Sequence, residues 1–329
     1  MDLKKKLGQL YTKAYGLHQE FFDQILTRFS SRQIKDLPEM VNPFFVTGIS
    51  GSLHIMNLAL KYIPSNVDLV LILNGMEKWE QDWVKNHFEV KAVITMDSKR
   101  TLPHSAILDL LLDNYANPFG ILDYDCFVFN QECFTAIQSF TANSVINSLF
   151  EYKYTNVNLR IPHTFFLFFN SQVIKRIKDK YGVNSSITDF RSGLNSTVLE
   201  GLNKIGINEN NYPETNKKYF DTLRLLVCLA YSEGYSCNIL DEFVTKPVEN
   251  SDAFHVGGVA NPNYYKSFWS MRGVYFWRRA LEECKDLKIK QKYHEKYGFK
   301  RPEEVFEKSP EIKNQISQEF YNFIEGIVH

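Results

Sequence analysis

The chain has 329 residues, and its 38 lysines and arginines are balanced by 38 aspartates and glutamates. A net charge of zero argues against capture of nucleic acid by bulk electrostatics, which needs a clear basic excess. Hydrophobic residues make up 44% and charged residues 23%, an ordinary globular mixture in a chain long enough for one large domain, with or without a subdomain.

The first residues and the cysteines bear on where the protein works. The start is basic but leads into no long apolar run, so we expect neither a signal peptide nor a membrane anchor. Five cysteines are scattered along the chain, a pattern typical of reduced thiols and not of a disulfide framework or a zinc site. We therefore expect a cytoplasmic protein.

Apolar periodicity predicts the elements of the first half of the chain. Helical spacing through residues 3–35 predicts an N-terminal helical extension. Strands then alternate with helices: strands are predicted at 43–48, 67–73, 90–95 and 119–122, and helices at 53–62, 77–87 and 105–115. Continuous apolar strands alternating with helices indicate a mostly parallel sheet covered on both faces. In such sheets, ligands bind beyond the carboxyl ends of the strands.

The alternation of strands and helices breaks down after residue 130. A dense apolar strand is predicted at 165–169, followed by a loop region at 181–215 that is rich in Asn, Ser and Gly. A strongly periodic helix is predicted at 220–231, and residues 268–329 are expected to be mostly helical.

Asp123 and Asp125 follow the predicted strand at 119–122 and precede a second apolar stretch. Two carboxylates one residue apart at a strand end can both approach one hard divalent cation, Mn²⁺ or Mg²⁺. The alternative is a solvated loop end, but unpaired charges embedded in apolar sequence would be costly. We therefore predict a metal site that neutralises a diphosphate leaving group, with Asp125 as a catalytic residue.

Residues 42–130 resemble the nucleotide-sugar-binding half of metal-dependent GT-A-fold glycosyltransferases. The mark of that family is a D-x-D motif after several β-α units, and here residues 121–128 read Ile-Leu-Asp-Tyr-Asp-Cys-Phe-Val. Residues 100–111 resemble the helix that leads into the motif, where the family carries small or basic residues near the ribose and sugar of the donor. The resemblance implies a mixed, mostly parallel sheet flanked by helices, and donor contacts from Arg100, His104 and Tyr124.

This resemblance also guides the division of the chain. We expect an N-terminal helical extension at 1–40 and a C-terminal helical region at 266–329. The catalytic domain between them, 41–265, is divided into a nucleotide-sugar-binding half at 41–130 and an acceptor half at 131–265.

His255 is the third candidate metal ligand, beside Asp123 and Asp125. The resemblance implies it, because metal-dependent members often place a histidine in a turn far downstream of the D-x-D. Gly257 and Gly258 follow, and glycines let backbone N–H groups approach a diphosphate closely. The alternative is a loop histidine beside an ordinary Gly-Gly turn. A histidine ligand favours Mn²⁺ over Mg²⁺.

A loop of small residues, Thr-Gly-Ile-Ser-Gly-Ser at 47–52, follows the first predicted strand of the sheet. Such a loop can wrap a base or a ribose, so Thr47, Gly48 and Ser50 are candidate donor contacts. It is neither a Walker loop nor a dinucleotide fingerprint. An ordinary strand-to-helix turn with Ser52 as N-cap is the alternative. Asp97, after the third strand, is a further candidate for the base or ribose, with capping or solvation as its alternative.

Asp221 stands at the start of the helix predicted at 220–231. Inverting members of the family use an acidic residue at a helix start in this region as general base, so the resemblance implies that Asp221 takes a proton from the acceptor hydroxyl. A plain N-cap is the rival interpretation. Asp241 and Glu242 are alternative bases, and the stereochemical outcome stays open.

Aromatic residues follow the His255 segment. Sugars stack on aromatic faces, so Trp269, Trp277, Tyr264 and Tyr265 could serve an acceptor, but we favour core packing. The buried helix face that we expect comprises Phe268, Trp269, Val274, Phe276 and Trp277. We expect the C-terminal residues to form a packing helix, with peripheral membrane contact if the acceptor is a lipid-linked glycan.

Three rival functions are weighed against a glycosyltransferase acting on a glycan or lipid-linked acceptor. A haloacid-dehalogenase-type phosphatase expects its D-x-D on the first strand and Thr or Val where Phe127 stands. A nucleotidyltransferase needs a basic Gly-rich loop, which residues 48–52 lack. An inactive scaffold that binds sugar nucleotides does not need to retain Asp123, Asp125 and His255 together. The sugar, the base, the acceptor and the oligomeric state stay open.

Overall fold

The computed structural model describes residues 30–96, 100–152, 155–214, 217–244, 251–263, 265–307 and 309–329. Most of the predicted N-terminal extension therefore lies outside the described residues, and of the helix predicted at 3–35 the described part is helical at 30–35.

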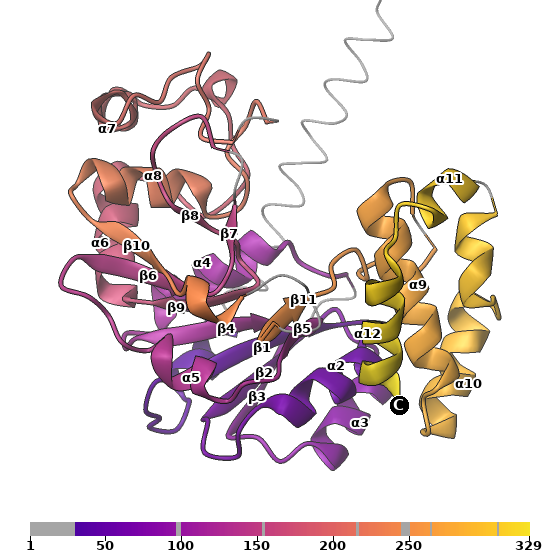
Figure 1. The fold of residues 1–329 in the computed structure, drawn as a ribbon. Coiled ribbons are helices and arrows are strands. Elements are labelled where there is room, and N and C mark those ends of the chain that lie inside the picture. The colour runs from indigo at the N-terminus through magenta and orange to yellow at the C-terminus, as the bar shows by residue number, and fades with distance from the viewer. Residues whose placement is uncertain are drawn as a thin grey trace, which may run out of the picture.

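A seven-stranded mixed sheet forms the centre of the molecule, with strand order β10-β6-β9-β4-β1-β2-β3 (Figure 1). The first four strands of this sheet along the chain are β1 (Phe44–Ile49), β2 (Leu69–Asn74), β3 (Ala92–Met96) and β4 (Phe119–Asp123). They run parallel to one another, so their carboxyl ends meet at one edge of the sheet. The predicted α/β class and these four strands are confirmed.

One strand in the second half of the sheet runs antiparallel to its neighbours. This half comprises β6 (Ser144–Ser148), β9 (Phe166–Phe169) and β10 (Ser236–Ile239). Strand β9, predicted at 165–169, runs antiparallel to both β4 and β6, whereas β10 is parallel to β6. Two short strands, β7 (Glu151–Tyr152) and β8 (Ile161–Pro162), pair outside the main sheet.

Helices cover both faces of the sheet. The three connecting helices predicted in the first half are present as α2 (Leu53–Ala59) with η1 (Leu60–Tyr62), α3 (Lys78–His87) and α4 (His104–Asn114). Alternate strand residues supply two cores: Phe44 and Val46 pack with α2 and α3, whereas Phe45 packs with α4. Burial on both faces explains why the strands read as continuous apolar runs. Short α5 (Glu132–Ala136) follows β5 (Cys126–Val128).

The second half holds helices that the sequence predicted only in part. They are α6 (Ser171–Tyr181), η2 (Phe190–Ser192), α7 (Ser196–Lys204), α8 (Arg224–Ser232) and η3 (Asp241–Phe243). Helix α7 lies within the predicted loop region at 181–215, so that prediction is wrong there. Its N-cap Asn195 accepts a hydrogen bond from the backbone N–H of Val198. This cap stabilises the start of a helix in a segment rich in turn-forming residues.

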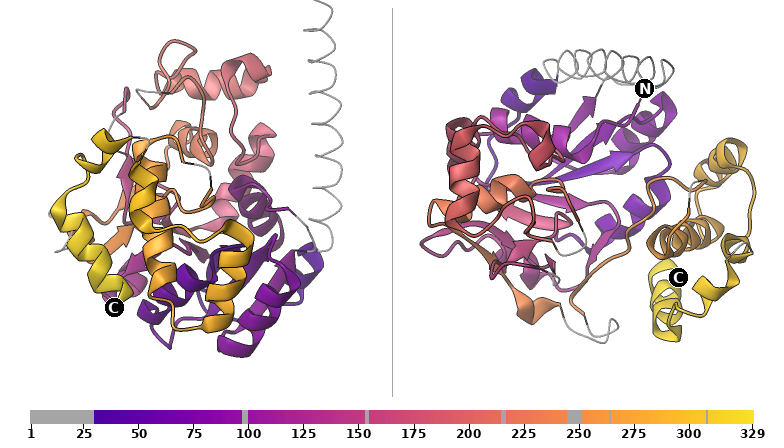
Figure 2. Two further views of the ribbon diagram at one scale, coloured as in Figure 1. Left: turned by 90° about the vertical axis from the view of Figure 1, so that its right-hand side faces the viewer. Right: turned by 90° about the horizontal axis from the view of Figure 1, so that it is seen from above.

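The C-terminal residues are mostly helical, as predicted. Their helices, orange to yellow in the figures, form a layer beside α2 and α3 (Figure 1 and Figure 2). The layer contains α9 (Phe268–Glu282), α10 (Leu287–Tyr297), η5 (Pro302–Phe306), α11 (Pro310–Lys313) and α12 (Gln318–Val328). Val274, Phe276 and Trp277 are buried as expected, but Trp269 is 59% exposed, so the predicted buried face is wrong at that residue. Trp269 lies in the first turn of α9, at the edge of the layer.

Two further observations concern expectations from composition. All five cysteines are free thiols, as predicted. Within the described ranges, no helix has the length and apolarity needed to cross a bilayer.

Candidate metal centre

The candidate metal centre is assembled by the pairing of two short strands. Strand β4 ends at Asp123, opposite Thr47 of β1, and the chain turns at Tyr124 and Asp125 into β5 (Cys126–Val128). Strand β11 (Ala253–His255) pairs antiparallel with β5, which sets His255 opposite Cys126. Segments far apart in the sequence therefore meet at the carboxyl edge of the sheet, where ligands bind in folds of this kind.

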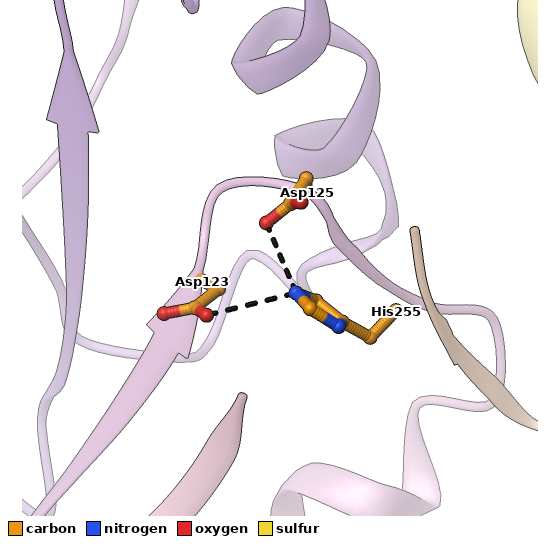
Figure 3. A group of neighbouring side chains, drawn as sticks. All are labelled: Asp123, Asp125 and His255. Carbon is orange, nitrogen blue, oxygen red and sulfur yellow. Dashed lines mark ion pairs between the residues drawn. The ribbon is translucent and has the colours of Figure 1, made fainter. Parts of the chain in front are cut away.

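Asp123, Asp125 and His255 point toward one another (Figure 3). The His255 Nε2 atom lies 3.4 Å from Asp125 Oδ1 and 3.7 Å from Asp123 Oδ2. One ligand atom from each residue lies within 4.8 Å of the other two. Ligand atoms that share an ion at about 2.1 Å lie roughly 3–4 Å apart. The three residues therefore fit one divalent cation in number, chemistry and spacing.

Backbone hydrogen bonds fix Asp125. Its carboxylate accepts from the N–H of Gly257 at 3.1 Å, and its backbone carbonyl accepts from the N–H of Val256 at 3.1 Å. Gly257 and Gly258 have φ angles of 70° and 73°, in the left-handed region that glycine adopts without strain. The Gly-Gly turn therefore shapes the loop around the motif.

Burial and neighbouring charge shift two titrating groups of the centre. The pKa of Asp123 is raised to about 7, chiefly by burial, with the Asp125 charge adding to the rise and His255 opposing it. The pKa of His104 is lowered to about 4 by burial and by the nearby His255. A cation between the two carboxylates would relieve their repulsion.

The centre opens into a cavity of about 350 Å³ at the carboxyl ends of β1, β2 and β4. Seven of the predicted site residues line it: Thr47, His104, Asp123, Tyr124, Asp125, His255 and Gly257. The His104 Nε2 atom lies 3.9 Å from Asp123 Oδ1, whereas His255 approaches Oδ2, the other oxygen of the same carboxylate. His104 therefore stands beside the three candidate metal ligands within the lining of the cavity.

Other predicted donor contacts lie elsewhere. A Cβ atom on Gly48 would lie 2.9 Å from Met56 Sδ, so this glycine packs into the core. Ser50 donates to Glu80 at 2.7 Å and accepts from Lys296 at 2.8 Å, which turns it toward α3 and α10. Arg100 precedes the cavity-lining residue Thr101 but does not itself line the cavity. Asp97 lies outside the described residues.

Asp221 is bound away from this cavity. Its carboxylate accepts from Lys217 and from the backbone N–H of Thr222. Burial is the largest single influence and raises its pKa, but the hydrogen bonds from Lys217 and Thr222 and the nearby positive charges together outweigh burial, so the net pKa is lowered. Helix α8 begins at Arg224, with Leu223 at the N-cap position, so the prediction that Asp221 caps a helix is wrong. Its role as a general base stays a prediction.

Ser52 is the other residue with a predicted cap. It occupies the N-cap position of α2, but its hydroxyl bonds to the backbone N–H and carbonyl of Ile49 instead of capping the helix. The loop therefore closes on itself as a strand-to-helix turn.

Sequence reasoning missed Asn74, which lines the cavity at the end of β2. Its side chain donates to the carbonyl of Leu102 at 3.0 Å and accepts from the N–H of Leu102 at 2.8 Å. It thereby holds the segment that leads into α4 and His104. A polar residue directly after the apolar strand at 67–73 was the available signal, because such residues end at the ligand-binding edge.

Comparison with known proteins agrees with the motif. Residues 23–174 match the family described as "StrH glycosyltransferase N-terminal domain". This range contains the first strand–helix units and the D-x-D. The resemblance to glycosyltransferases is therefore confirmed for this part of the chain.

A curated relative and two solved structures were also found. The chain is 32% identical over 98 residues to dTDP-dihydrostreptose–streptidine-6-phosphate dihydrostreptosyltransferase of Streptomyces griseus. That alignment covers 30% of this chain and spans 25% of the relative's length. Glycosyltransferase GlyE of Streptococcus pneumoniae overlaps 79% of this chain and 64% of its own, at 11% identity and a TM-score of 0.38. The 4-diphosphocytidyl-2C-methyl-D-erythritol synthase of Anaerococcus prevotii overlaps 42% of this chain and 75% of its own, at 11% identity and a TM-score of 0.30.

Proposed function

We propose that the protein is a glycosyltransferase that moves a sugar from a nucleoside-diphosphate sugar to an acceptor, using a divalent cation bound by Asp123, Asp125 and His255. One observation carries the proposal: the three ligand atoms converge within 4.8 Å beside a cavity at the ligand-binding edge of the sheet. The match of residues 23–174 to a glycosyltransferase domain supports the same reaction class.

We assign different parts of the donor to different residues around the cavity. Asp123 and Asp125 provide hard oxygen ligands, and the imidazole of His255 makes Mn²⁺ a better candidate than Mg²⁺. When bound, the cation supplies Lewis-acid stabilisation to a diphosphate leaving group. Thr47 and Asn74 also line the cavity, and we propose that they lie near the ribose or the base of the donor.

The comparisons suggest where to look for substrates. The relative from Streptomyces griseus is named for a dTDP-linked sugar donor and a phosphorylated acceptor, so dTDP-sugars are the first donors to test. A glycan or a lipid-linked acceptor is proposed on the other side of the reaction. Asp221 remains our candidate general base, with Asp241 and Glu242 as alternatives.

Release of a nucleoside diphosphate from a panel of dTDP-, UDP- and GDP-sugars in the presence of Mn²⁺ tests this function. We expect Mn²⁺-dependent release from at least one donor, and loss of at least about a hundredfold in the Asp125→Asn variant, because a metal supplies several kcal/mol of charge stabilisation. Asp113→Asn is the matched control, since Asp113 forms an ion pair with Lys178 away from the cavity.

Two outcomes would contradict the proposal. One is the absence of release from every donor, with or without Mn²⁺. The other is equal release by the wild type and by Asp125→Asn, which would place the reaction somewhere other than the proposed metal centre.

A further inference from the structure

Helix α9 is in backbone contact with the loop that carries His255. A Cβ atom on Gly273, in the middle of α9, would lie 2.5 Å from the carbonyl carbon of Gly258 and would overlap the carbonyl oxygen of Gly257. A Cβ atom on Gly258 would in turn lie 2.9 Å from the Cα of Ser270. Only glycine permits this approach, because every other residue would insert a side chain between the two backbones.

The residue next to Gly273 adds a hydrogen bond to this contact. Arg272 donates from Nη2 to the carbonyl of Val256 at 2.6 Å. Its guanidinium carbon lies 4.2 Å from the ring centre of Trp269 and 4.9 Å from that of Phe320. Aromatic rings on both α9 and α12 therefore hold the guanidinium in place.

The same loop contacts the D-x-D motif from its other side. His255 faces both aspartates, the N–H of Val256 bonds to the Asp125 carbonyl, and the N–H of Gly257 bonds to the Asp125 carboxylate. Residues 255–258 are thus held between the motif and α9. A displacement of α9 against this loop would displace His255 relative to Asp123 and Asp125.

We propose that Gly273 and Arg272 are positioning residues of the metal centre, so that the C-terminal helices set where His255 stands. This inference rests on the proposed function, because it assumes that His255 is a metal ligand. Metal sites need their ligands held within about 0.5 Å of the productive geometry. The Gly273 contact gives that precision because it joins two backbones directly.

The presence of glycine inside α9 is itself informative. A glycine in a helix interior is less favourable than alanine by about 1 kcal/mol. At Gly273 this cost to helix stability is offset by the close packing of α9 against residues 257–258, which a side chain would prevent. Gly326, inside α12, offers a matched control, because a Cβ atom there would meet nothing within 4 Å.

Titration with Mn²⁺ alone tests the inference, with free Mn²⁺ followed by its electron paramagnetic resonance signal. We expect Gly273→Ala to bind Mn²⁺ about tenfold or more weakly than the wild type, the size of effect seen when groups that orient metal ligands are removed. Gly326→Ala should bind as the wild type does. Thermal unfolding of each variant establishes that the measured protein is folded.

Arg272→Lys supplies a second variant in case Gly273→Ala does not fold. Lysine keeps the positive charge near the metal centre but lacks the planar guanidinium, which stacks on Trp269 and Phe320 while it donates a hydrogen bond to Val256. We therefore expect this variant also to bind Mn²⁺ several-fold more weakly. Wild-type affinity in folded Gly273→Ala or in Arg272→Lys would overturn the inference. A wild-type protein that binds no Mn²⁺ would instead contradict the metal centre, and the proposed function with it.

Discussion

Burial holds several histidines of this protein in the neutral form. His54, on α2, is fully buried, and its Nε2 lies 2.9 Å from the carbonyl of Trp277 on α9. Burial lowers its pKa from 6.5 to about 4, although the hydrogen bond to Trp277 opposes the shift. His163 is affected in the same way, with a pKa lowered to about 3 by burial and by the charge of Arg224. Neutral imidazoles of this kind link stability to pH.

The stability of the protein should therefore fall as the pH drops below 6.5, in part through His54. Because its pKa is lowered on folding, the unfolded chain binds a proton between pH 6.5 and about 4 while the native state does not. Each pH unit in that window then removes about 1.4 kcal/mol from the free energy of unfolding. His54→Gln should abolish this contribution, so that the variant gains about 2 kcal/mol relative to the wild type between pH 7 and pH 5.

Urea denaturation of both proteins at pH 7 and pH 5 measures this difference. Parallel losses of stability in the wild type and in His54→Gln would show that His54 does not carry the effect.

Individual site residues differ in how well the sequence predicts them. Asp123 and Asp125 could be singled out because two carboxylates at a strand end stand in apolar sequence. His255 was a candidate because the family resemblance implies a histidine far downstream of the D-x-D. Ser50 could not be placed, because its direction depends on Glu80 and Lys296, which come from α3 and α10. Contacts between distant segments decide such orientations, and local sequence does not report them.

At the scale of elements, the site depends on how the strand ends are joined. Asn74 ends β2 and bonds twice to the backbone of Leu102, which leads into α4. Glu80 of α3 plays a similar part for the loop after β1, since its carboxylate accepts from the N–H of Gly51 at 2.8 Å and from the Tyr293 hydroxyl at 2.7 Å. Side chains thus fasten both loops to neighbouring elements, and the Leu102 segment held by Asn74 lines the cavity.

Asn74→Ala should weaken both the fold and nucleotide binding. Loss of the side chain leaves a buried N–H and a buried carbonyl of Leu102 without partners, which should lower the free energy of unfolding by about 2 kcal/mol. Asn147→Ala is the matched control: Asn147 is buried in β6 and bonds to the carbonyl of Ile137 at 2.7 Å, away from the cavity. Calorimetry with dTDP and Mn²⁺ should show weaker binding in Asn74→Ala alone. Equal binding by the two variants would mean that the Leu102 segment does not contact the nucleotide.

Elements with strong periodicity were predictable, and those shaped by context were not. Strands β1 to β4 are continuous apolar runs because both of their faces are buried. Helix α7 was not predicted because the sequence on either side of it is rich in turn-forming residues. The direction of β9 is set by its pairing with β4 and β6, which apolar composition alone does not encode.

At the scale of the whole molecule, the C-terminal helices share one core with the sheet. Apolar residues of α9, α10 and α12 are buried in the same cluster as those of α2 and α3. The Trp277 indole donates to the carbonyl of Gly51 at 2.8 Å, which joins α9 to the loop after β1. The sequence predicted these helices but not their contacts with the first half of the chain, because residues such as Gly51 and Glu80 lie more than two hundred positions before their partners Trp277 and Tyr293.

The central claim is that Asp123, Asp125 and His255 bind one divalent cation together. Anomalous diffraction from crystals soaked in Mn²⁺, recorded at the manganese absorption edge, tests it most directly. We predict a single strong peak within about 2.5 Å of oxygens of Asp123 and Asp125 and of His255 Nε2. A well-ordered site without such a peak, or manganese bound elsewhere in the molecule and absent here, would contradict the account.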